Sequence, residues 1–407
     1  MRSVAIGMLS LICLGTGTDC SDAVTQSEPL ADLQMPPAAS DLGEKGTSAD
    51  FYADTSVIEI ELTFAEAEWT QLMAYHRAGK KEFVHCGVAF RGTQFPDAAC
   101  RPKGRPSGWV DEPKPQLVVA FDRWDNKGRF LGLRRINLEA VPYHPAPVRD
   151  RIGMWLMHKA GLQAPRVNHA RVNKNGQYYG LYMNIEHIDK EFLERHFENP
   201  TGNLYADGYM LETNKTENNY QRLWDLNDLV IAEPLAGDHS AFFARLTALL
   251  DLRTMLRMTA AEVVLPTSDN WSNGSANYYY YDDPFSHRFV HLPWDLDTFL
   301  TSFSPPTAAI YNFWGIPGNE NPPNKMLQLV YQNPLWKREF EDQLIALREG
   351  PYREMPAQVT AVCQQIRPYV ATDPHRIGSI EDLDRDCQDI KNGIAARIQY
   401  IKTVLGR

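Results

Sequence analysis

The sequence lacks several patterns that mark common functional classes. It has no apolar run of about 18 residues or more, so no transmembrane helix is expected. It contains no C-x-x-C or H-E-x-x-H spacing, which argues against a structural zinc site and a zinc hydrolase. Basic residues are scattered, with 41 Lys and Arg against 51 Asp and Glu and a net charge of −10. This balance argues against nucleic acid or an anionic membrane as the main partner.

Other features are those of a globular protein with a sizeable core. The chain has 407 residues, of which 43% are hydrophobic and 11% aromatic. Such a length accommodates one large two-lobed domain or two to three ordinary domains. No internal repeat is present, and a monomer is expected.

The first residues have the features of a secretory signal. Arg2 supplies a positive charge, residues 4–14 form a short apolar core, and small residues follow. We therefore predict a signal peptide at residues 1–18 and a flexible linker at residues 19–50, which is rich in Ala, Ser, Pro and acids. The protein would be exported, whether secreted, periplasmic or at the cell surface. Lipidation of Cys20 is disfavoured because Asp19 occupies a position that needs a small residue.

Cysteine usage agrees with export. Outside the N-terminal segment the cysteines fall into two local pairs, Cys86 with Cys100 and Cys363 with Cys387. An oxidising compartment favours a disulfide within each pair. Four free buried thiols remain the alternative at this stage.

Hydrophobic periodicity predicts a mixture of strands and helices along the chain. Period-2 and β-rich segments predict strands at residues 57–62, 83–90, 94–100, 114–122, 169–172, 278–281 and 288–292. Helical spacing predicts helices at residues 65–76, 148–160, 192–197, 327–348, 355–370 and 380–405, with further helices between 223 and 261.

Acidic and amide side chains flank a predicted hairpin in the second half of the chain. Asp269 opens a polar loop, and Asn277 begins the aromatic strand at residues 278–281. Asp295 and Asp297 follow the second strand. Mg²⁺ prefers such hard oxygen ligands, and protein kinases place an Asp, an Asn and a further Asp in this order. The spacing of eight residues from Asp269 to Asn277 is longer than the Asp-to-Asn spacing in the kinase loop, however. By itself the pattern fits an Asx-rich turn with surface acids.

Several motifs resemble those of the CotH family, the spore-coat-protein-H-type kinases. They are D-N-W…N-Y-Y-Y-Y-D-D…L-P-W-D-L-D-T-F from residue 269, F-L-G-L-R-R-I-N-L at 130–138, Y-Y-G-L-Y-M-N-I-E-H-I-D at 178–189 and G-N-L-Y at 202–205. The resemblance covers roughly residues 57–303, with its blocks in the family's order. It implies an α+β, two-lobed atypical protein-kinase-like fold over residues 51–303. Residues 304–407 would form a helical C-terminal extension packed on the larger lobe.

The resemblance also implies a reaction. The chain would transfer the γ-phosphoryl group of ATP to Ser or Thr hydroxyls of a protein substrate, with ATP and Mg²⁺ as cofactors. Asp269 would orient or deprotonate the acceptor hydroxyl. Asn277 and Asp295 would hold Mg²⁺, and Asp297 would assist them or fix the loop.

The nucleotide would meet residues earlier in the chain. By analogy with the family, Arg101 and Lys103 lie in a basic, glycine-containing phosphate segment, and Lys114 precedes a strand as a phosphate-binding lysine. The backbone from Glu186 to Ile188 would meet adenine. Each of these residues also has a simpler interpretation as a solvated loop, a strand end or part of a sheet core.

Two alternatives remain open. Asp150, near the start of the helix at 148–160, is compatible with a role on a kinase-type αC helix, although packing and capping are the favoured explanation for this residue. A catalytically inactive binding module with the same fold is the rival function. It would display Trp271 and the tyrosines at residues 278–281 to a polymer or partner.

Overall fold

The computed structural model describes residues 46–104, 114–273, 276–311 and 324–407. The predicted signal at residues 1–18, Cys20, nearly all of the linker and residues 105–113, which include the end of the basic segment, lie outside the described residues. Among the described helices, none combines the length and the apolar character that crossing a membrane requires.

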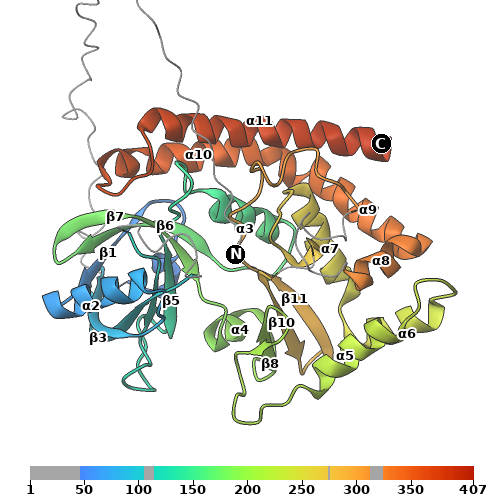
Figure 1. Ribbon diagram of the computed structural model, residues 1–407, viewed down its shortest axis with the longest axis horizontal. Helices are drawn as coiled ribbons and strands as arrows, with labels where there is room; N and C mark the ends of the chain where they lie inside the picture. Colours follow the sequence, from blue (N-terminus) through green and yellow to red (C-terminus); the bar gives the residue numbers. More distant parts are fainter. Residues whose placement is uncertain (1–45, 105–113, 274–275, 312–323) are drawn as a thin grey trace, which may run out of the picture. The chain divides into compact units, whose positions relative to one another are not determined.

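Helices and strands are mixed along the chain, as the sequence predicts (Figure 1). The strands are β1 (Ile58–Thr63), β2 (Val84–Phe90), β3 (Thr93–Pro102), β4 (Leu117–Ala120), β5 (Arg135–Glu139), β6 (Val167–Lys174), β7 (Gln177–Glu186), β8 (Asn203–Ala206), β9 (Met210–Leu211), β10 (Tyr278–Asp283) and β11 (Arg288–Pro293). The helices are α1 (Ser48–Phe51), α2 (Glu66–Arg77), α3 (Arg149–Lys159), α4 (Lys190–His196), α5 (Gln221–Ala232), α6 (Ser240–Leu249), α7 (Leu252–Val264), α8 (Lys325–Gln332), α9 (Pro334–Glu349), α10 (Pro351–Thr372) and α11 (Ile380–Leu405), with a short 3₁₀ helix, η3, at Trp271–Asn273.

Seven of the described strands close into a barrel in the order β1-β2-β3-β4-β5-β7-β6. Strands β1 and β6 close it in parallel, and the other neighbouring strands are antiparallel. Apolar and polar residues alternate along β1, so that Ile58, Ile60 and Leu62 enter the barrel core. The sequence predicts most of these strands but not the closure of the barrel.

A second sheet has the order β11-β10-β8-β9. Its central hairpin pairs β10 with β11, and Tyr281 lies opposite Val290. The turn is stabilised by Asp283, whose carboxylate accepts hydrogen bonds from the backbone N–H groups of Phe285 and Ser286. The β10–β11 hairpin predicted from the sequence is therefore confirmed.

The C-terminal region consists of helices α8 to α11, and α10 and α11 pack side by side (Figure 1). Buried residues recur every three or four positions along α11, where Leu383, Cys387, Ile390 and Ile394 face the protein interior. The segment 327–348, predicted as one helix, is two: Asn333 caps α9 and Pro334 begins it, because proline lacks the N–H that a continuous helix would need.

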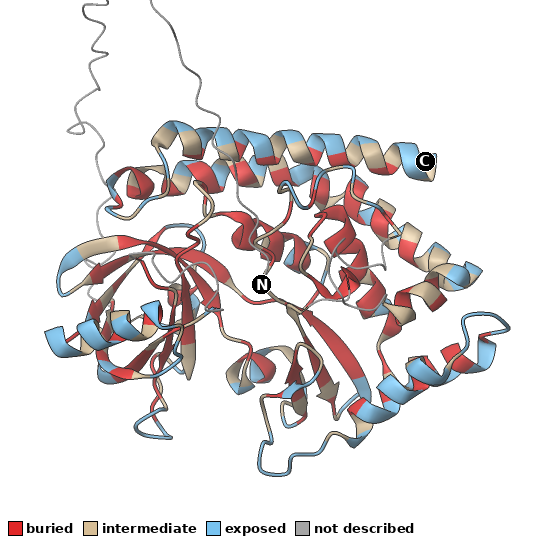
Figure 2. Ribbon diagram, viewed as in Figure 1, coloured by how far each residue is buried: buried red, intermediate tan, exposed pale blue. Residues whose placement is uncertain are grey.

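Both predicted disulfides form, Cys86–Cys100 between β2 and β3 and Cys363–Cys387 between α10 and α11. Buried residues dominate the barrel strands, helix α7 and the β10–β11 hairpin (Figure 2). Exposed residues line the outer side of α11 and half of the positions of α2 (Figure 2).

Candidate active site

The loop that carries Asp269 follows helix α7. Glu262, buried near the end of α7, accepts a hydrogen bond from the backbone N–H of Ser272 at 3.3 Å. Asn270 is also buried, and its side-chain oxygen accepts from the N–H of Asn273 at 3.1 Å. These contacts fix the loop immediately after Asp269.

Asn277 joins this loop to strand β10. Its Nδ2 donates to the backbone oxygen of Asp269 at 2.8 Å, and its backbone N–H donates to Asp207 at 2.8 Å. Its φ of 67° lies in the left-handed region, which asparagine tolerates better than most residues. Because Nδ2 holds Asp269, the side-chain oxygen of Asn277 is the atom suited to bind a cation.

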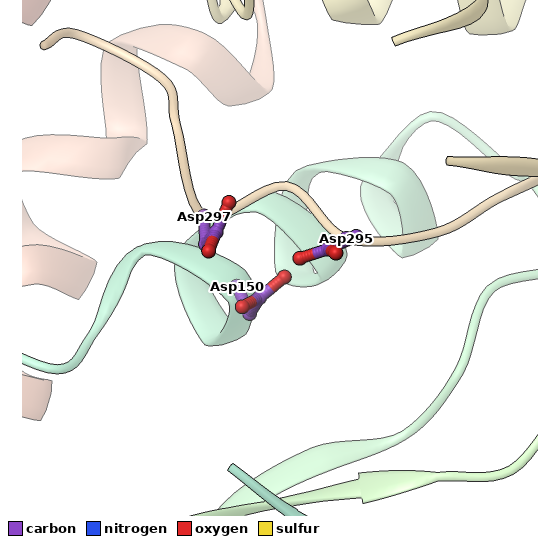
Figure 3. A group of neighbouring side chains, drawn as sticks. All are labelled: Asp150, Asp295 and Asp297. Carbon is purple, nitrogen blue, oxygen red and sulfur yellow. The ribbon is translucent and has the colours of Figure 1, made fainter. Parts of the chain in front are cut away.

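Three carboxylates converge at the end of β11 (Figure 3). Asp295 and Asp297 lie on the loop after the strand, and Asp150 projects from helix α3 (Figure 3). One oxygen of each lies within 4.8 Å of the others. The backbone N–H of Leu296 donates to Asp150 at 2.7 Å and so fixes the loop to α3.

The electrostatics of this cluster fit a divalent cation. Burial, followed by repulsion from Asp295, raises the pKa of Asp150 to about 7. Burial raises the pKa of Asp297 to about 6, and Lys103 opposes that rise. Carboxylates so close together repel one another when ionised, and a bound cation would relieve this repulsion. Their hard oxygen atoms are also the ligands that Mg²⁺ prefers.

Lys103 reaches the same region from the end of β3. Its backbone N–H donates to Gln116 at 3.0 Å, which continues the pairing with the β4 side of the barrel. Its ammonium forms an ion pair with Glu139, the last residue of β5. Burial lowers the pKa of Lys103, while Asp295 and Asp150 act in the opposite direction. Lys103 can therefore present a positive charge beside the three carboxylates.

These groups line one cavity of about 640 Å³, within the usual size range of ligand sites. Its wall includes Lys103, Asp269, Asn277, Asp295 and Asp297 among the residues expected from the sequence. The other lining residues are Lys81, Gly104, Gln116, Glu139, Val141, Tyr143, His144, Asp150, Trp294, Thr298, Thr301, Ser302 and Phe303.

Lys114 does not line this cavity. Its Nζ donates to Asp373 at 2.9 Å and to the backbone oxygen of Leu181 at 2.9 Å. The side chains of Lys114 and Asp373 are only 10% and 2% exposed, so they form a buried ion pair between the barrel and the end of α10.

Arg101, Glu186 and Ile188 are also absent from the cavity wall. Arg101 donates to the backbone oxygen of Pro102 at 3.0 Å and lies over the Phe83 ring. Glu186 binds two guanidinium groups, from Arg166 and Arg195. Ile188 is buried in the apolar cluster beneath β8, β10 and β11. Each of these three residues therefore makes structural contacts outside the cavity.

Two cavity residues, Asp150 and Glu139, are not predicted from the sequence as part of the metal or phosphate site, although Asp150 is considered there for a role on the helix. Asp150 begins a helix, where an acid is favoured by the helix dipole whatever its function. Glu139 ends an apolar strand and resembles any charged residue at a strand end. The aromatic residues of the rival display function are mostly buried, with Trp271, Tyr280 and Tyr281 at most 6% exposed.

Comparison with known proteins points to one family. The family model described as "CotH kinase protein" matches residues 103–401. The inner spore coat protein H of Bacillus subtilis (strain 168) is 25% identical over 299 residues, which represent 67% of this chain and 79% of that protein.

Two solved structures are distant matches. One is from the toxin–antitoxin complex of HipA, HipB and operator DNA of Shewanella oneidensis MR-1, at 12% identity and a TM-score of 0.38, covering 84% of this chain and 82% of that chain. The other is the Helicobacter pylori proinflammatory kinase CtkA, at 10% identity and a TM-score of 0.29, covering 71% of this chain and 95% of that chain.

Proposed function

The chain belongs to the family of CotH kinase proteins, and we propose that it transfers the γ-phosphoryl group of ATP to Ser or Thr hydroxyls of a protein. One observation carries this proposal. Asp269, Asn277, Lys103 and the three clustered carboxylates line a single cavity although they come from distant parts of the chain. Protein kinases perform phosphoryl transfer with the same kinds of side chain.

Asp150, Asp295 and Asp297, together with the side-chain oxygen of Asn277, would hold Mg²⁺. When bound, Mg²⁺ neutralises charge on the β- and γ-phosphate oxygens. The cavity is rich in carboxylates, which would otherwise repel a triphosphate. This charge balance supports a nucleotide that arrives with its metal ions.

Asp269 is the proposed residue that orients the acceptor hydroxyl and accepts its proton. The hydroxyl oxygen attacks the γ-phosphorus while the bond from that phosphorus to the β–γ bridging oxygen breaks, and ADP leaves. The hydroxyl proton passes to the carboxylate of Asp269. The hydrogen bond from Asn277 to the backbone of Asp269 holds this loop beside the metal-binding residues. Positioning and charge neutralisation supply most of the rate enhancement in such a reaction.

Lys103 is the proposed phosphate-binding lysine, and Glu139 orients it. Burial lowers the pKa of Lys103, and the neighbouring carboxylates of Asp295 and Asp150 oppose that shift. Lys114 is assigned instead to the stability of the barrel, because its ammonium is occupied by Asp373 and Leu181.

Export is also proposed. The two disulfides, Cys86–Cys100 and Cys363–Cys387, are typical of an oxidising compartment. The signal peptide at residues 1–18 remains a prediction from the sequence. An exported kinase would have to meet ATP before or during export, or from an extracellular source.

The decisive experiment combines nucleotide binding with transfer. We expect ATP with Mg²⁺ to raise the melting temperature of the protein more than ATP with EDTA does. We also expect label from [γ-³²P]ATP to appear in a generic acceptor such as casein. A protein that shows no metal-dependent shift and no labelling would be an inactive binding module, and the kinase proposal would be wrong.

A further inference from the structure

Helix α3 and the loop that carries Asp295 and Asp297 are joined by consecutive contacts. The carboxylate of Asp150 accepts from the N–H of Leu296 at 2.7 Å. The neighbouring Arg149 donates from Nε to the backbone oxygen of Phe299 at 3.0 Å. Gly153 allows the loop to lie close, because a Cβ at this position would be only 2.8 Å from Cβ of Leu296. The loop therefore depends on α3 for its position.

Arg149 also connects α3 to the C-terminal helix α11. Its Nη2 and Nη1 donate to the two carboxylate oxygens of Asp386, at 2.8 and 3.2 Å. Asp386 accepts a further hydrogen bond from the N–H of Ala146, just before α3, at 3.1 Å. The side chains of Arg149 and Asp386 are 5% and 14% exposed, so this two-point ion pair is protected from solvent.

The same face of α11 supports the chain beyond the loop. Gly393 and Arg397 follow Asp386 by seven and eleven positions, a helical spacing. Gly393 packs against Leu300, where an added Cβ would lie 3.1 Å from the leucine side chain. Arg397 is fully buried and donates to the backbone oxygens of Val263 and Pro306. Helix α11 thus contacts both the end of α7, which precedes the loop of Asp269, and the chain that follows the loop of Asp295 and Asp297.

From these contacts we infer that Asp386 is a positioning residue for phosphoryl transfer, acting through Arg149 on the loop that holds Asp295 and Asp297. This inference rests on the proposed kinase function. A simple attachment of α11 to α3 would need only the Arg149–Asp386 pair. The additional bond from Nε to Phe299 extends the connection to the candidate metal-binding loop. The Cys363–Cys387 disulfide lies next to Asp386 and fixes α11 to α10 at this point.

The test compares Asp386→Asn with Asp384→Asn in the full chain. Asp384 provides a matched control because it pairs with Arg367 on the exposed side of α11. Loss of a residue that orients metal ligands typically costs 10- to 100-fold in metal affinity or activity. We expect Asp386→Asn to weaken Mn²⁺ binding, measured by calorimetry, by about that factor. We expect Asp384→Asn to leave Mn²⁺ binding unchanged.

Hydrogen exchange provides a readout that does not depend on activity. We expect peptides covering residues 295–300 to exchange faster in Asp386→Asn than in Asp384→Asn. Asp386→Glu keeps two acceptor oxygens for Arg149 and should bind Mn²⁺ more tightly than Asp386→Asn. If Asp386→Asn fails to fold, the double variant Arg149→Met/Asp386→Asn leaves no unpaired buried guanidinium and should show the same faster exchange.

The inference is overturned if exchange of residues 295–300 is unchanged, or if it rises while Mn²⁺ binding and transfer to casein remain normal. Failure of the kinase proposal looks different. In that case the wild-type protein would neither bind Mn²⁺ nor label casein, and the role of Asp386 in phosphoryl transfer would fall with it. The exchange data would then report only whether Asp386 fixes the loop.

Discussion

The backbone N–H of Leu296 donates to the carboxylate of Asp150 at 2.7 Å and joins the loop after β11 to helix α3. Leu296 lies between Asp295 and Asp297 in the sequence, so this hydrogen bond keeps both of their carboxylates close to the carboxylate of Asp150. An acid at the start of a helix thereby becomes part of the candidate metal site.

Replacement of Asp269 should separate chemistry from binding. Asp269→Asn removes the proposed proton acceptor but retains the backbone oxygen that Asn277 binds. We expect the rate of transfer to casein to fall by about 10²- to 10⁴-fold, the usual contribution of a general base. The melting-temperature shift produced by Mg-ATP should persist. Loss of that shift together with activity would instead assign Asp269 to nucleotide or metal binding.

The sequence offers both Lys103 and Lys114 as phosphate ligands, and one variant of each distinguishes between them. Lys103→Met should weaken ATP binding about 10- to 100-fold, because a hydrogen bond from a charged group is lost. Lys114→Met should leave the ATP affinity of the folded protein unchanged. It should lower the free energy of unfolding by about 3 kcal/mol, because Asp373 remains buried without its cation.

Calorimetric titration with ATP measures the ATP affinity of each variant, and unfolding in urea measures its free energy of unfolding. The opposite result, with weak ATP binding in Lys114→Met and normal binding in Lys103→Met, would assign phosphate binding to Lys114 and not to Lys103.

Glu262 should make stability depend on pH. Burial raises the pKa of Glu262 to about 8, above its usual value of 4.5. Between these values the folded state holds a proton that the unfolded state releases, so the contribution of Glu262 to stability falls as pH rises. The loss should approach about 1.4 kcal/mol per pH unit within this window.

Urea unfolding at pH 5.5 and 7.5 measures this loss. Glu262→Gln should reduce the difference between the two pH values, since glutamine keeps an oxygen that can accept from Ser272 and does not titrate. The exposed Glu354 on α10 provides a control, and Glu354→Gln should preserve the wild-type difference. An equal pH dependence in wild type and Glu262→Gln would show that Glu262 does not hold this proton.

The two disulfides should contribute similarly to the free energy of unfolding, but only Cys363–Cys387 should affect Mn²⁺ binding at the candidate site. Their sequence separations are 14 and 24 residues, and each should contribute about 3 kcal/mol through loop closure. Replacement of Cys363 and Cys387 by serine should also weaken Mn²⁺ binding, because the bond lies beside Asp386 on α11. Replacement of Cys86 and Cys100 should not. Equal Mn²⁺ affinities in the two double variants would contradict this difference.

Local features were predictable because neighbouring residues produce them. The β10–β11 hairpin follows from an aromatic strand, an Asp-Asp-Pro turn and a second strand. Helix α11 follows from its apolar period. The disulfides join the cysteines that are close together along the chain, as the two local pairs suggested. The break at Asn333 was missed because apolar spacing continues across it.

The sequence by itself indicated most of the strands and helices, the two local pairs of cysteines and the motifs of the family, since periodicity and spacing are properties of residues close together in the chain. Only the tertiary structure decided that Lys103 reaches the cavity while Lys114 meets Asp373. It also brought Asp150 beside Asp295 and Asp297. The physical reason is that barrel closure and helix packing fix which way a side chain points, and these depend on contacts between residues far apart in the chain.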